Sequence, residues 1–64
     1  MVKINGECID AAGKTVTEYL SDANYDTRRI VVEHNEVIVP KEQYDEIVLA
    51  DGDIVEVVSF MGGG

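Results

Sequence analysis

The longest β-strand signal in the chain is Ile54-Val55-Glu56-Val57-Val58-Ser59-Phe60, close to its C-terminal end. Its apolar residues fall on both faces of a strand, with Ile54, Val58 and Phe60 on one face and Val55 and Val57 on the other. Strands that are apolar on both faces are typical of the middle of a sheet. We therefore expect this strand to be buried on both faces, to be central and to lie beside the first strand of the chain.

The N-terminal segment predicts that first strand as half of a β-hairpin. Residues 2–4 and 7–10 alternate between apolar and polar side chains, and Asn5-Gly6 lies between them. Asn-Gly is the strongest short-range hairpin signal, because a type I′ turn needs positive φ at both of its central residues.

One amphipathic helix is predicted after the hairpin. Thr15 and Glu18 have the spacing of a capping box, in which each side chain accepts a hydrogen bond from the other residue's backbone amide. An apolar stripe at helical spacing follows, formed by Val16, Tyr19, Leu20 and Ala23. We expect the helix to end near Asn24 and residues 25–29 to form a polar connection.

The middle of the chain predicts two more strands. Residues 30–32 are β-branched, and an Asn35-Glu36 turn leads into residues 37–39. Pro40 stops the second of these strands and can start a single helical turn.

The order of hairpin, helix and further strands places one helix against one face of a mixed sheet. Residues 47–49 are a brief additional strand candidate, and Asp51-Gly52 forms a tight turn before the last strand. The sequence thus predicts an α+β domain of the β-grasp (ubiquitin-like) kind over residues 1–60. Its sheet would be mixed and have four to five strands, with one main helix. Residues 61–64 would form a flexible, glycine-rich C-terminal tail.

Composition limits the classes of function. With 64 residues, the chain fits one small domain with a thin core and no internal active-site cavity. Thirteen acidic and five basic residues give a formal net charge of −8, which argues against binding to nucleic acids or anionic membranes. The acidity serves solubility, forms an acidic face that docks on a basic partner, or does both. Because no apolar run suits a signal peptide or a membrane span, we expect a soluble, cytoplasmic protein.

Neither the single cysteine nor the single histidine has the surroundings of a catalytic group. Cys8 alone cannot form an internal disulfide or a four-cysteine metal site. It lies in a predicted strand without an adjacent base or cationic cluster, which argues against a redox role. His34 has no accompanying nucleophile motif, and we expect it to be structural.

The remaining polar candidates do not form a site either. Two pairs of carboxylates lie near turns without a surrounding ligand loop: Glu7 with Asp10, and Asp51 with Asp53. We expect them to be solvated turn residues and not a metal or acid–base site. Tyr19 is expected in the helix core, whereas Tyr44 suits either a minor core position or an interface. The sequence therefore predicts that the protein is not an enzyme.

The chain ends in Gly62-Gly63-Gly64, directly after Phe60-Met61. Glycine has no Cβ, so consecutive glycines can enter a narrow channel and adopt angles closed to other residues. Four extended residues span about 13–14 Å, enough to carry a terminal carboxylate into another protein's active site. Taken alone, a glycine-rich end is also typical of a frayed terminus or a cloning remnant.

Four segments spread over the chain carry a resemblance to a known family. They are Ala12-Gly13-Lys14-Thr15-Val16 before the helix, Asn35-Glu36-Val37-Ile38-Val39-Pro40 in the middle, Asp51-Gly52-Asp53 before the last strand, and the terminal glycines. In this order and at this length, the chain resembles the ubiquitin-like sulfur carrier proteins, most closely the ThiS family of bacterial thiamine biosynthesis. Members of that family commonly end in two glycines, whereas this chain has three.

The resemblance implies a carrier and not a catalyst. An adenylating enzyme of the ubiquitin-activating type would use ATP and magnesium to activate the carboxylate of Gly64, with Gly62 and Gly63 threading the tail into its active site. Sulfur from a persulfide, supplied by a donor such as a cysteine desulfurase, would replace AMP and leave a C-terminal thiocarboxylate. The thiazole synthase would accept this sulfur for the thiazole ring of thiamine, and the carrier would bind no cofactor. Trimming to Gly63 is the alternative terminus.

Phe60 and Met61 are the expected partner interface. These large apolar residues precede the tail and suit either a cap on the end of the sheet or a patch that docks on the activating enzyme. Two alternatives to the whole interpretation stay open. One is a carrier of the same fold for another pathway, such as the small subunit of molybdopterin synthase. The other is a β-grasp interaction module whose glycines have no chemical role.

Overall fold

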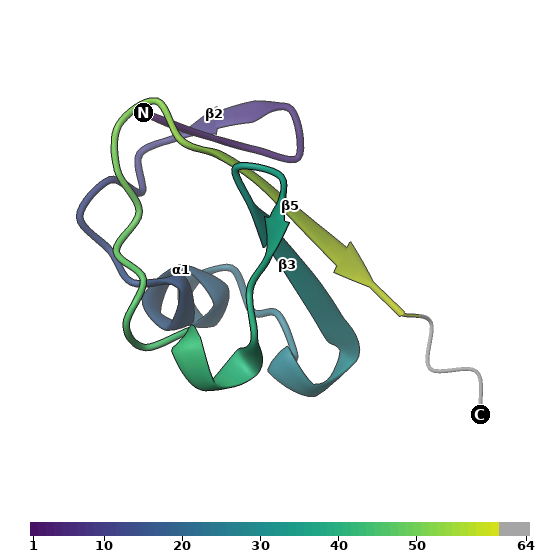
Figure 1. The fold of residues 1–64 in the computed structure, drawn as a ribbon. Coiled ribbons are helices and arrows are strands. Elements are labelled where there is room, and N and C mark those ends of the chain that lie inside the picture. Colours follow the sequence, from purple (N-terminus) through teal and green to yellow (C-terminus); the bar gives the residue numbers. More distant parts are fainter. Residues whose placement is uncertain (61–64) are drawn as a thin grey trace.

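The computed structural model describes residues 1–60; residues 61–64, including the expected glycine tail, lie outside the described part. Within residues 1–60, one mixed sheet is covered on one face by a single α-helix (Figure 1). The strands are β1 (Val2–Ile4), β2 (Glu7–Ile9), β3 (Ile30–His34), β4 (Val37–Ile38) and β5 (Ile54–Ser59), and the helix is α1 (Val16–Asp22). The predicted α+β architecture is confirmed.

The last strand lies in the centre of the sheet. The strand order is β2-β1-β5-β3-β4, with β5 parallel to β1 and antiparallel to β3. The pairs Lys3↔Ile54 and Val32↔Val57 fix the two registers. The predicted position of this strand, central and beside the first strand, is confirmed.

Both strong local signals act as predicted. Asn5 and Gly6 have φ values of 51° and 84°, as the Asn-Gly hairpin turn requires. At the start of α1, the backbone amide of Glu18 donates to Thr15 Oγ1 at 3.1 Å, and that of Thr15 donates to Glu18 Oε1 at 2.8 Å. The helix ends at Asp22 with Ala23 as its C-cap, slightly earlier than expected, and Ala23 is exposed and not part of the buried stripe.

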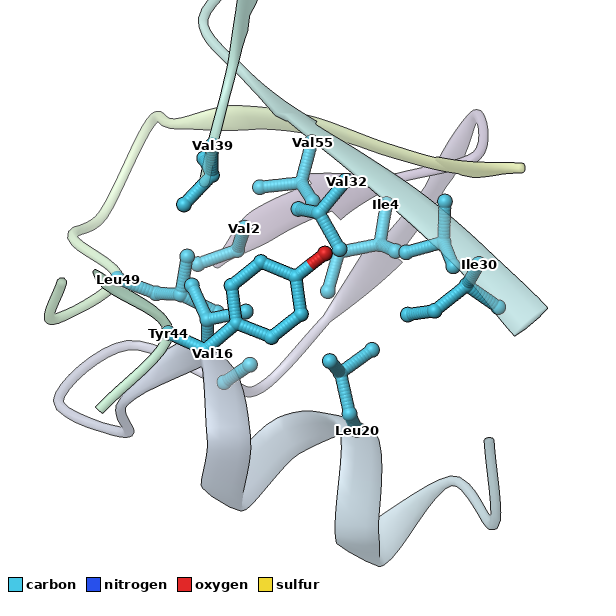
Figure 2. Close-up of a cluster of buried hydrophobic side chains, with 12 residues drawn as sticks. Val2, Ile4, Val16, Leu20, Ile30, Val32, Val39, Tyr44, Leu49 and Val55 are labelled. Carbon is cyan, nitrogen blue, oxygen red and sulfur yellow. The ribbon is translucent and has the colours of Figure 1, made fainter. Parts of the chain in front are cut away.

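The hydrophobic core lies between α1 and one face of the sheet (Figure 2). Val16 and Leu20 point from the helix toward Val2, Ile4 and Val32 on the strands. The loop that follows β4 completes the core with Val39, Tyr44 and Leu49. Tyr44 is only 4% exposed, which resolves the choice left open by its sequence in favour of the core. Burial raises the pKa of its hydroxyl group.

The second face of β5 is not buried, and on this point the prediction was wrong. Val55 and Val57 are buried against the helix side, but Ile54 and Val58 are 54% and 52% exposed. One short helix covers only one face of the sheet, so β5 is central without being buried on both sides. The apolar residues on its other face therefore need an explanation other than core packing.

Two segments differ from expectation. Residues 47–49 do not form a strand, because only one bridge, Thr15↔Val48, links them to the segment before α1. Residues 25–29 are more ordered than a polar connection: they contain the 3-10 helix Thr27–Arg29, and Tyr25 packs against the core. The single helical turn after Pro40 is confirmed as the 3-10 helix Lys41–Gln43.

Candidate functional site

The described chain ends where the expected tail begins. The strand β5 ends at Ser59, and the backbone amide of Phe60 still donates to the carbonyl of Arg29 at 2.7 Å. Phe60 thus continues the β3–β5 pairing by one residue, and its side chain is 52% exposed. Figure 1 shows β5 leading out of the body of the fold at this end. Met61, Gly62, Gly63 and Gly64 lie outside the described residues.

Two asparagines, one on each side of β5, hold the backbone of this strand. Asn5 Oδ1 accepts from the amide of Val57 at 2.8 Å, and Asn5 Nδ2 donates to the carbonyl of Val57 at 3.2 Å. On the other side, Asn35 Oδ1 accepts from the amide of Ile54 at 2.9 Å. Asn35 has the same φ as Asn5, 51°, so both are turn residues whose side chains extend a backbone ladder. These hydrogen bonds hold the backbone of β5, the strand that precedes residues 61–64.

His34 belongs to a structural hydrogen-bond network at the start of β5. Its Nε2 lies 2.7 Å from Asp53 Oδ2, which also accepts from the amide of Ala50 at 2.9 Å. Asn35 Nδ2 donates to the other carboxylate oxygen of Asp53 at 3.2 Å. The hydrogen bond from His34, more than any other contact, holds the pKa of the Asp53 carboxyl below its ordinary value. This network ties the β3–β4 turn to β5, in keeping with the structural role expected for His34.

The outward side of the sheet forms a surface that sequence reasoning largely missed. We call it the open face and define it by residues whose pairing places them opposite the helix side: Lys3, Cys8, Val31, Glu33, Ile38, Ile54, Glu56 and Val58. Of these, only Ile54 and Val58 had been assigned to a strand face from the sequence, and that face was expected to be buried. In β3, buried Ile30 and Val32 alternate with the less buried Val31 and Glu33. This alternation indicates an outward-facing side, but only the register with β5 shows which residues of the two strands share it.

A shallow depression of about 570 Å³ lies at one end of the open face. It is lined by Lys3, Gly6, Asn35, Glu36, Ile54, Val55 and Glu56. Its lining combines an apolar floor with charged side chains of both signs. This depression is open to solvent and can admit a side chain of a partner, but its shape does not enclose a small molecule.

The other sequence candidates do not come together. Cys8 is exposed on β2 and pairs directly with Lys3 on β1. Asp51 pairs with the N-terminal amine, whereas Asp53 belongs to the His34 network. Within residues 1–60, no group of three or more His, Cys, Asp or Glu side chains could hold a metal ion. No helix in that same range is long and apolar enough to cross a membrane.

The chain is similar to known proteins over almost its whole length. The ThiS family matches residues 2–64. The sulfur carrier protein ThiS of Bacillus subtilis is 35% identical over 68 residues, and the match covers 100% of both chains. The sulfur carrier protein ThiS of Thermus thermophilus is 38% identical over 64 residues, again with 100% of both chains covered. These relatives confirm the prediction of a non-catalytic carrier.

Another similar relative is a much longer protein. The thiazole synthase of Paramagnetospirillum magneticum is 44% identical over 62 residues, a match that covers 95% of this chain and 19% of that protein. The chain therefore spans about a fifth of the length of this relative.

A solved structure supports both the fold and the family. The crystal structure of the thiamine biosynthesis protein ThiS from Geobacter metallireducens superposes with a TM-score of 0.79 at 36% identity, covering 98% of this chain and 97% of that one. This agreement confirms the expected β-grasp fold. Since the family match runs from residue 2 to residue 64 and two ThiS carriers are matched over their whole length, the chain belongs to the ThiS family of sulfur carrier proteins.

Proposed function

We propose that this chain carries sulfur as a thiocarboxylate on Gly64 and donates it for the thiazole ring of thiamine. One observation carries the proposal: the family match extends through the glycines to residue 64, and these residues directly follow the central strand of the fold. Gly64 would be the reactive residue, and Gly62 and Gly63 would thread the tail into the active site of an adenylating enzyme. Met61 and Phe60 would contact that enzyme.

The proposed loading has three chemical steps. The Gly64 carboxylate attacks the α-phosphate of ATP, whose charge is balanced by magnesium on the adenylating enzyme, and pyrophosphate is released. A persulfide sulfur, drawn from cysteine by a desulfurase, then displaces AMP and forms an acyl disulfide. A thiol cleaves this disulfide and releases the thiocarboxylate. Adenylation is needed because a carboxylate lacks a good leaving group, whereas AMP is one.

In this mechanism the carrier supplies recognition and delivery. The side chains of Asn5 and Asn35 hydrogen-bond to the backbone of β5, and these bonds hold the strand that leads to Phe60 against the rest of the domain. From Phe60, four residues reach about 13–14 Å when extended. Ordering them costs roughly 4–8 kcal/mol of backbone entropy, which the adenylating enzyme must offset with main-chain hydrogen bonds.

Thiazole synthase is the proposed acceptor of the sulfur. Support comes from the thiazole synthase of Paramagnetospirillum magneticum, about a fifth of which is similar to this chain. We expect the reaction to take place in the cytoplasm, where ATP and reduced thiols are available.

Mass spectrometry and an activation assay test the proposal. Intact protein from its native host should contain a fraction heavier by one oxygen-to-sulfur exchange, located at Gly64. With the adenylating enzyme, ATP and magnesium, the carrier should stimulate pyrophosphate release. Deletion of Gly63 and Gly64 should abolish this stimulation without changing the melting temperature of the domain. Unchanged pyrophosphate release after the deletion would disprove tail chemistry and leave an interaction module.

A further inference from the structure

The open face exposes several large apolar side chains to solvent. Ile38, Ile54 and Val58 are 62%, 54% and 52% exposed, and Val31 lies beside Val58 in the β3–β5 register. Phe60 continues the same strand toward the tail. Exposed apolar side chains that cluster on one face mark sites of protein interaction. This face is also continuous with the interface proposed above.

Two carboxylates lie in the middle of this apolar surface. Glu33 on β3 is paired directly with Glu56 on β5, and both side chains belong to the open face. Residues opposed in this way have Cβ atoms about 4.5–5.5 Å apart, and like charges at that spacing destabilise a sheet. The protein therefore keeps an electrostatically unfavourable pair of side chains in the middle of the open face.

No cation within residues 1–60 forms an ion pair with Glu33 or Glu56, and Lys41, in the 3-10 helix after Pro40, takes part in no ion pair there. Lys14 pairs with Asp22, while Arg28 and Arg29 lie against Asp26. The open face does hold Lys3, opposite Ile54, but no ion pair within residues 1–60 joins it to either glutamate. The negative charge at the centre of the face is thus left for a partner.

We propose that the open face docks on the adenylating enzyme, which places an arginine between Glu33 and Glu56 and surrounds it with apolar side chains. A guanidinium group has five N–H donors in one plane and can serve two carboxylates at once, which a single ammonium group does less well. The depression beside Glu56 gives such a side chain room to enter. The inference rests on the proposed function, because β5 leads from this face directly to the tail.

The same charges argue against a second copy of the chain as the occupant. An isologous contact through this face would bring four carboxylates together, two from each copy. Each chain also carries a formal net charge of −8, so two copies repel one another.

A nearly isosteric double variant that removes both negative charges tests the docking. In Glu33→Gln/Glu56→Gln, we expect the KM for the carrier in adenylation-dependent pyrophosphate release to rise about 10-fold or more, with kcat at saturating carrier unchanged. The melting temperature of the same variant should rise, because the like-charge pair is removed. Weaker binding by a more stable protein is the signature that a purely structural role would not produce.

The matched control is Glu42→Gln/Glu46→Gln, which changes the net charge equally at two exposed residues outside the open face. Its KM should stay within about 2-fold of the wild-type value, as expected for exposed charges distant from an interface. If both double variants behave alike while the wild-type carrier is adenylated, the docking inference is wrong and the proposed function stands. If the wild-type carrier is not adenylated, both fail. A lower melting temperature for Glu33→Gln/Glu56→Gln, or dimerisation of the wild-type chain that this variant abolishes, would also overturn the inference.

Discussion

Asn5 is the residue through which the first turn of the chain holds the last strand, and Asn5→Gly tests how much that contact contributes. Its side chain makes two hydrogen bonds to the backbone of Val57, one in each direction. Glycine tolerates the φ of 51° at this position, so the substitution removes the hydrogen bonds without straining the turn.

The expected cost follows from the two lost bonds. An intramolecular hydrogen bond contributes about 0.5–1.5 kcal/mol net, so the free energy of unfolding should fall by about 1–3 kcal/mol. No strand replaces Asn5 here, because β1 ends at Ile4 and the amide of Val57 would turn to water. For a domain of this length, 1 kcal/mol corresponds to about 4–8 °C in melting temperature, which predicts a decrease of about 4–24 °C. Domains of this size are stable by only about 3–10 kcal/mol in total, so the effect is a large share.

Asn24→Gly provides the matched control. Asn24 also has a positive φ, 62°, but its side chain makes no hydrogen bond within residues 1–60. Urea denaturation of both variants, with the slope of unfolding compared to verify two-state behaviour, should show a loss for Asn5→Gly and almost none for Asn24→Gly. Equal stabilities of the two variants would show that the Asn5 clamp contributes nothing and that the reasoning from these contacts is wrong.

Two further predictions concern Asp53 and Phe60. Because the folded-state pKa of Asp53 is lowered, its carboxylate contributes stability that is present above the unfolded value of about 3.9 and is lost as the pH falls through the lower folded value. Asp53→Asn should therefore reduce stability at neutral pH and flatten its decline below about pH 4 in thermal melts; a decline as steep as that of the wild type would contradict this. Phe60→Ala should weaken binding to the adenylating enzyme more than it lowers stability, since the half-exposed ring contributes only about 1 kcal/mol to folding. Calorimetry that gave the reverse order would assign Phe60 to the core.

Signals contained within a few neighbouring residues predicted the fold well. Asn5-Gly6 gave the hairpin, and the pair Thr15 and Glu18 gave the start of α1, because each of these patterns acts through its own backbone. Residues 47–49 were wrongly assigned as a strand candidate because their backbone partners, Gly13, Lys14 and Val16, lie just before α1 and at its first residue and form only one bridge. An apolar run does not reveal how long its partner strand is.

The candidate site was predicted only in part, for a related reason. Phe60 could be proposed from the sequence because only Met61 separates it from the glycines, whereas the pair of Glu33 and Glu56 could not, because cross-strand register alone brings these two residues together. Ile54 and Val58 were interpreted as core residues. Burial inside a fold and docking on a partner select the same side chains, so an apolar strand face in a sequence does not distinguish between them.

The position of the open face has a consequence for the order of events in the proposed pathway. The residues of β5 form the middle of this face, and the four residues after Phe60 would span at most about 13–14 Å when extended. An enzyme that acts on Gly64 must approach within that distance of Phe60, and therefore close to the open face. The adenylating enzyme and the thiazole synthase would then occupy overlapping surfaces of a very small domain, and only one could bind at a time. We expect transfer to require release from the first enzyme before capture by the second, so moderate affinity for each partner serves the carrier better than tight binding to either.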